Sequence, residues 1–160
     1  MKKSVEAQIT MKSVVKSMIL AVAVSVAALT HPAQAGSLLL RSEVAELAGI
    51  AYQNYRYGRV NAMLSDENEC WDDAAKESGE VKRVLVAACA TTAMAGAIVE
   101  ATHARKQGRG SHSAYTGEGA RERIFRRSGL SEQETQQIME ETVEPSVSAI
   151  LSGLQGAGMR

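Results

Sequence analysis

Two residues with metal-binding and acid–base chemistry, Glu100 and His103, stand three positions apart in a stretch that we expect to be helical. This spacing places the carboxylate and the imidazole on one helical face. Carboxylate-bridged di-metal bundles use Glu-x-x-His, but they need a second such pair and two more glutamates, which the chain lacks. Together with His112, the remaining histidine after residue 35, these residues define an alternative, metal-binding or enzymatic function. The simpler interpretation is a structural contact between the two side chains on the surface near a helix end. We favour it, and we therefore predict no bound metal or cofactor.

Other catalytic signatures are missing from the sequence. The chain contains no H-E-x-x-H, G-x-S-x-G, Walker loop or C-x-x-C-H. We therefore predict a non-enzymatic protein.

The two cysteines, Cys70 and Cys89, are spaced for a structural disulfide. Gly79 lies nine residues after the first and ten before the second, so a helical hairpin that turns at Gly79 brings both thiols to the same level. Packed helices are about 8 to 10 Å apart, which leaves a Cα separation that a disulfide accepts. A zinc site would need further ligands, and a nucleophilic thiol would need a base, and no local motif supplies either. The sequence therefore predicts a Cys70–Cys89 disulfide.

Charge is distributed unevenly along the chain. The 18 basic and 18 acidic residues balance overall, but four basic and one acidic residue lie before residue 36, which leaves 14 and 17 and a net charge of −3. This acidic excess argues against a nucleic-acid partner. Residues 66–77 hold six acids and one lysine, and a basic segment follows at 105–127. Its members are the candidate partner-binding residues: Arg105, Lys106, Arg109, Arg121, Arg123, Arg126 and Arg127. They either steer an acidic partner or form a solvated face that the acidic segment partly attracts.

The N-terminal segment resembles a cleavable leader by its order of charge and hydropathy. Lys12 and Lys16 precede the 12 apolar residues of 18–29, and Ala33-Gln34-Ala35 follows as an A-x-A cleavage site. We expect residues 1–35 to be a signal peptide, cleaved near Ala35, with translation starting at Met1 or Met11. The apolar run is short for a membrane anchor, which needs about 20 residues. We thus predict a periplasmic or extracellular protein with no stable membrane anchor after cleavage.

The remaining chain has the pattern of an all-α protein, a small bundle of four or five helices with one cross-linked hairpin. Apolar spacing predicts a helix over 38–64, interrupted at Gly58, and a second, short helix that begins after Ser65 and ends near Lys76. We expect a loop over 107–117, a basic helix over 119–128, and a capped helix from Ser131 that is kinked at Pro145. We expect one helical domain over residues 36–155 and a flexible tail over 156–160.

The strongest helical signal covers residues 80–106. Its centre, 84–99, has 16 residues without a charge, which predicts a helix buried at the centre of the bundle. Small residues four apart, such as Thr92 with Gly96 and Ala93 with Ala97, would let a neighbouring backbone come close. A neighbouring helix of the same chain is one such neighbour, and a second copy of the chain is the other, so a structural homodimer stays open.

These observations together predict an exported, non-enzymatic protein-binding module, such as an inhibitor, an immunity protein, a chaperone or a secretion accessory. The expected partner is a protein of the cell envelope, recognised by the basic segment.

Overall fold

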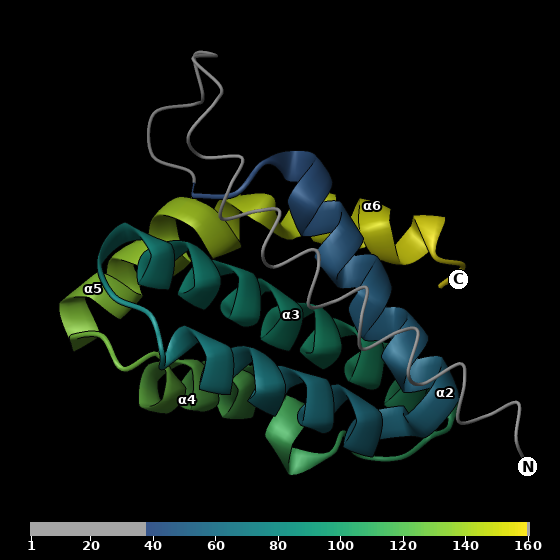
Figure 1. The fold of residues 1–160 in the computed structure, drawn as a ribbon. Coiled ribbons are helices and arrows are strands. Elements are labelled where there is room, and N and C mark those ends of the chain that lie inside the picture. Colours follow the sequence, from purple (N-terminus) through teal and green to yellow (C-terminus); the bar gives the residue numbers. More distant parts are fainter. Residues whose placement is uncertain (1–37, 160) are drawn as a thin grey trace, which may run out of the picture. The chain divides into compact units, whose positions relative to one another are not determined.

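The computed structural model describes residues 38–159, and this part of the chain is all-α. Figure 1 shows a bundle in which two long antiparallel helices lie side by side and shorter helices cover them. The elements are α2 (Arg41–Ala74), α3 (Gly79–Lys106), the 3-10 turn η1 (Ser113–Tyr115), α4 (Gly117–Arg127), α5 (Glu132–Ile138), the π turn η2 (Met139–Val143), the 3-10 turn η3 (Glu144–Ser146) and α6 (Val147–Gly156). The predicted fold class is confirmed. The predicted signal peptide and its cleavage site lie outside the described residues.

The predicted helix break at Ser65 is wrong. The helix continues through Ser65 to Ala74, because Met63, Glu67 and Cys70 all face the core, and this burial outweighs the local capping signal. The interruption lies instead at Arg59, one residue after Gly58, where φ is 58° and ψ is −149°. The long helix therefore consists of two helical segments joined by a kink at Arg59.

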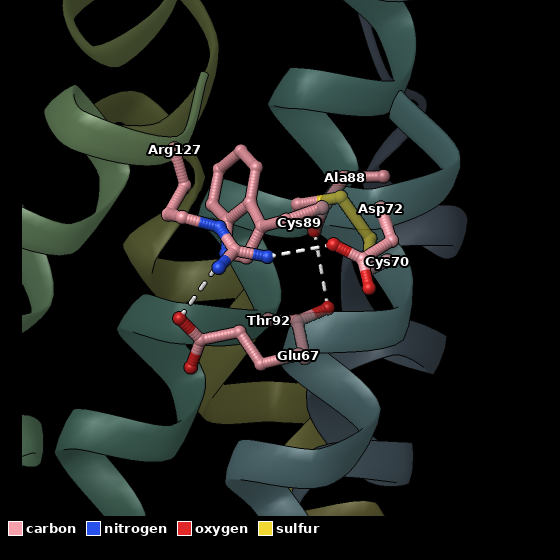
Figure 2. Close-up of a disulfide and its surroundings, with 8 residues drawn as sticks. Glu67, Cys70, Asp72, Ala88, Cys89, Thr92 and Arg127 are labelled. Atoms are coloured by element: carbon pink, nitrogen blue, oxygen red, sulfur yellow. Dashed lines mark hydrogen bonds and ion pairs between the residues drawn. A yellow bond between two sulfur atoms is a disulfide. The ribbon is translucent and has the colours of Figure 1, made fainter. Parts of the chain in front are cut away.

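The α2–α3 hairpin turns where the sequence predicts. Gly79 begins α3 with a φ of +59°, a left-handed conformation that glycine adopts readily. The Cys70–Cys89 disulfide is present, with a Cα separation of 5.7 Å. It joins α2 to α3 in Figure 2, close to Glu67 and Asp72 of α2 and to Arg127 of α4. Closing this 19-residue loop stabilises the fold by about 3 kcal/mol on a chain-entropy model.

Helix α3 is the buried centre of the bundle, as predicted. Among the described helices it alone is long and apolar enough to cross a membrane by length and composition, and 78% of its most apolar window is buried inside the protein. At Gly96 of α3 the close neighbour is an aromatic ring and not a helix backbone, because an added Cβ would lie 2.5 Å from the ring of Tyr115. Ala93 and Ala97 are buried as well. The small-residue face of α3 is thus covered within the chain.

The C-terminal third follows the predicted helices with local changes. Ser131 and Glu134 form the expected capping box of α5. Because Pro145 has no amide hydrogen to donate, the chain passes through η2 and η3 before it resumes as α6. This change of pitch rotates the predicted apolar stripe, so that Val147 and Leu151 are exposed.

The predicted flexible tail begins as ordered structure. Gly156 is still part of α6, and the carbonyl oxygens of Ala157 and Gly158 accept hydrogen bonds from Gln53 and Tyr52. Residues 156–159 therefore lie against α2 through these bonds.

Candidate functional site

A buried carboxylate on α2, Glu67, organises one side of the bundle. It is 2% exposed and accepts two hydrogen bonds from the Arg123 guanidinium, 3.0 Å from Nε and 2.9 Å from Nη2. The Trp71 indole and the Tyr115 hydroxyl donate to the same carboxylate, at 3.2 and 2.9 Å. Burial, together with the charge of Glu67, raises the pKa of Tyr115, so its hydroxyl stays protonated and donates. The carboxylate is thus fully occupied by donors from α2, η1 and α4.

A second buried carboxylate, Glu100 of α3, is held in the same way. It accepts two hydrogen bonds from Arg109, at 2.6 and 3.2 Å, and one from the backbone amide of His112 at 3.0 Å. The Arg109 hydrogen bonds lower the pKa of Glu100, against the opposing effect of its burial. Arg109 also donates to the Tyr55 hydroxyl at 3.4 Å, so the loop after α3 is fixed to both long helices.

The three residues of the metal-binding alternative are not gathered into one site. Glu100 is engaged by Arg109, and His112 uses its Nδ1 to accept the Ala114 amide at the start of η1. His103 faces α2 instead. No group of three or more His, Cys, Asp and Glu side chains that could hold a metal ion lies within residues 38–159.

His103 is packed among aromatic rings. Its imidazole stacks on Tyr55, with 4.6 Å between the ring centroids, and on Tyr52 at 6.1 Å. Its Nε2 atom is buried and has no hydrogen-bond partner. Burial is the main cause that lowers the pKa of His103, and the charges of Lys106 and Arg59 lower it further. The imidazole is therefore held in its neutral form next to a cationic surface.

Most of the predicted basic segment is engaged within the fold. Besides Arg109 and Arg123, Arg127 pairs with Asp72 at 2.9 Å, and Arg121 pairs with Glu144 at 3.2 Å. Arg126 lies 3.6 Å from Glu122. The attraction between the acidic segment 66–77 and the basic segment is confirmed by the pairs that Arg123 and Arg127 form with α2. Arg105 and Lys106 lie exposed in the last turn of α3.

Two cations from different helices, Arg59 of α2 and Lys106 of α3, both act on His103, and Arg56 and Arg105 lie close to them in the sequence. We call Arg56, Arg59, Arg105 and Lys106 the kink patch; all four side chains are exposed. Arg59 lies over the Tyr55 ring, 5.3 Å from its centroid, and Tyr55 in turn stacks on His103. Arg56, Arg59 and Arg105 form no ion pair within the described part of the chain. Arg56, Arg59 and Arg105 therefore display positive charge that no ion pair within residues 38–159 neutralises.

The backbone of Arg59 is the most unusual feature of the kink patch. Its φ of 58° is the only positive φ of a non-glycine residue between 38 and 159. Such a conformation costs an arginine on the order of 1–3 kcal/mol and is often found at functional sites. Sequence analysis did not select Arg56 and Arg59, although the succession Arg56-Tyr57-Gly58-Arg59, with basic residues around a glycine inside a helical pattern, was a usable signal.

A second surface feature is a shallow groove of about 630 Å³ between α4 and α5. Half-buried Phe125 lies in it, with the guanidinium of Arg121 5.6 Å from the ring centroid. Glutamates and arginines alternate around it: Glu118, Arg121, Glu122, Arg126 and Glu132, with Gln136. Charge of both signs gives this groove no preference for an anionic or a cationic ligand.

Comparison of the chain with protein-family models, with curated proteins and with solved structures gives no match in any of the three.

Proposed function

We propose that the protein works outside the cytoplasm as a non-enzymatic binding module, and that its kink patch recognises an acidic surface on another protein. The observation that carries this proposal is the strained backbone of Arg59, an exposed arginine of the kink patch. Folding into the kinked helix costs free energy at this residue, and the cluster leaves its charge available to a partner.

The charge distribution supports an anionic partner. Five arginines of the basic segment pair with carboxylates of the same chain, whereas Arg56, Arg59 and Arg105 form no ion pair within residues 38–159. Glu100, a carboxylate that acts on His103, is already paired with Arg109. Uncompensated like charges within one patch attract an oppositely charged surface and accelerate its association.

The chemistry around the kink patch supports a protein rather than a small-molecule partner. Tyr57 is 77% exposed between Arg56 and Arg59, and exposed tyrosine and arginine are enriched at protein interfaces. The Cys70–Cys89 disulfide is compatible with an oxidising compartment beyond the cytoplasm.

The test is photo-crosslinking in the producing cell. A photoreactive phenylalanine analogue at Tyr57 should form an adduct with a partner that carries an acidic patch. Arg59→Gly should abolish or strongly reduce this adduct. The same substitution removes the strained φ, so the thermal stability of the protein should stay equal or rise. Loss of binding without loss of stability separates recognition from folding.

Arg126→Gln serves as the matched control, because it removes one positive charge from an exposed side chain on α4. Its adduct should keep its intensity. Absence of any adduct at position 57, or equal losses in the Arg59→Gly and Arg126→Gln variants, would refute the proposal.

A further inference from the structure

The imidazole of His103 joins the end of α3 to the kink of α2. It stacks on the rings of Tyr55 and Tyr52, with 4.6 and 6.1 Å between ring centroids and 23° and 15° between ring planes. The guanidinium of Arg59, at the kink, lies 5.3 Å from the centroid of the same Tyr55 ring. One imidazole ring therefore connects the two long helices at the end of the hairpin away from its turn.

Both tyrosines that contact this imidazole also hold a further segment of the chain. The Tyr52 hydroxyl donates to the carbonyl oxygen of Gly158 at 3.3 Å and so holds the C-terminal segment against α2. That segment, residues 145–159, carries no titratable side chain. The Tyr55 hydroxyl accepts from Arg109 of the loop after α3 at 3.4 Å. A movement of the imidazole would thus reach the kink, the loop and the C-terminal segment together.

The position of His103 suits a neutral imidazole and not a charged one. Its Nε2 atom is buried and has no hydrogen-bond partner among residues 38–159. A charged imidazole carries a proton on each ring nitrogen, so one proton would be buried on Nε2 without an acceptor. Burial of a charge without a matching acceptor is costly, and the packed stack leaves this cost uncompensated.

The charged groups around His103 add to this cost. Three cations oppose a further positive charge there: Arg59 of α2, Lys106 of α3 and Arg109 of the following loop. Glu100 would favour it, but this carboxylate is already paired with Arg109. A cation attracts a tyrosine ring, but the Tyr55 ring already faces the guanidinium of Arg59. Because burial and these cations lower the pKa of His103, opening of the stack takes up a proton, and acid favours the open form below about pH 6.5.

We propose that His103 is a pH-sensitive latch at this end of the hairpin. When its imidazole takes up a proton, the ring leaves Tyr52 and Tyr55, and the end of α3, the kink of α2 and the C-terminal segment loosen together. The opening is confined to this end, because the Cys70–Cys89 disulfide holds the two helices together nearer to their turn. Acid thereby uncovers two aromatic rings. This inference does not rest on the recognition of an acidic partner.

Hydrogen exchange measured by mass spectrometry tests the latch, with rates corrected for the effect of pH on intrinsic exchange. From about pH 7.5 to about pH 5.5, protection of residues 52–59 and 99–106 should fall about three- to tenfold, and tenfold is the most that one proton allows for an open-state pKa of about 6.5. This loss should not change in urea concentrations below unfolding, because a local opening exposes little surface. Protection of residues 84–92, beside the disulfide, should fall with urea.

Substitutions identify the titrating group. His103→Gln stays neutral at both pH values and should abolish the acid-induced loss of protection. His103→Phe keeps a ring that can stack and should give the same result, which covers a failure of the glutamine variant to fold. His112→Gln is the matched control, and it should keep the acid-induced loss. Tyr52→Phe removes the hydrogen bond to Gly158 and should release the C-terminal segment at both pH values.

Four results would overturn the proposal. The first is a change of less than about twofold in protection of residues 52–59 and 99–106 between the two pH values. The second is the same loss in His103→Phe as in the unmodified protein, and the third is abolition of the loss by His112→Gln. The fourth is a loss that grows with urea as steeply as that of residues 84–92, because the whole fold would then open at once.

Discussion

Removal of the charge of Arg123 should destabilise the fold strongly, because it leaves a buried carboxylate without a cation. Glu67 is 2% exposed and the Arg123 side chain 14% exposed, so water screens this pair poorly. Breaking a buried pair by removing one partner costs about 3–5 kcal/mol. Trp71 and Tyr115 still donate to Glu67 in Arg123→Met, so we expect the lower end, about 3 kcal/mol, which is more than a hundredfold in the folding equilibrium.

A second substitution, at Glu67, tests whether the free energy of unfolding rises again once the unpaired charge is removed. Glu67→Gln added to Arg123→Met replaces the unpaired buried charge by a neutral amide, whose oxygen still accepts a hydrogen bond. The double variant should therefore be more stable than Arg123→Met alone. Urea denaturation followed by Trp71 fluorescence measures both free energies of unfolding. Arg126→Met, which changes a side chain that is 66% exposed, should cost less than about 0.5 kcal/mol.

The reasoning would be refuted by either of two results. A cost below about 1 kcal/mol for Arg123→Met would mean that Glu67 is reached by water or finds another partner. A double variant less stable than the single one would mean that the Glu67 carboxylate, held by Trp71 and Tyr115 alone, is more favourable in the core than a neutral amide.

Two further predictions concern His103 and the close approach of α2 and α6. Because burial and neighbouring cations lower the pKa of His103 below its ordinary 6.5, the unfolded chain binds more protons, so the free energy of unfolding should fall as pH decreases from about 6.5 towards the lowered pKa. His103→Gln should remove that part of the slope, and an unchanged slope in urea titrations at several pH values would contradict the stacked, neutral imidazole. Gly153→Ala should destabilise by about 1–3 kcal/mol or more, since its Cβ would meet the Ala45 carbonyl oxygen. Gly156→Ala, which has no heavy atom within 4 Å, should be neutral or stabilising in the same melts, and equal effects at the two positions would contradict the packing of α6 on α2.

Local signals predicted the hairpin well because both of its determinants are local. Gly79 can adopt the left-handed turn, and its nearly equal separations from Cys70 and Cys89 along the chain place the thiols at one level. The same kind of signal failed at Ser65, where a cap followed by acidic residues looks like a helix start. What decides there is the burial of Glu67, whose partner Arg123 is 56 residues away. A helix boundary that depends on such a distant contact is not visible in a local pattern.

The metal-binding alternative shows the same limit from another side. Glu100 and His103 do lie on one helix at the expected spacing, but their surroundings differ. Arg109 reaches back to neutralise Glu100, and Tyr55 of α2 stacks on His103. The spacing along α3 predicts that the two side chains are near each other. It does not predict which residues from elsewhere in the chain contact each of them.

The charged residues of a sequence can bind a partner only where the folded chain does not already pair them with opposite charges. The basic segment 105–127 holds seven cations, and the fold commits five of them to carboxylates of the same chain. Two further members, Arg105 and Lys106 in the last turn of α3, would be an ordinary complement to the negative end of that helix if they stood alone. Their role changes once α2 is considered, because Arg59 of α2 and Lys106 of α3 both act on His103 although more than 40 residues separate them in the sequence. The strained backbone of Arg59 is the reason to assign function here, because helix stabilisation alone gives no reason to hold an arginine in a conformation that glycine would adopt at lower cost.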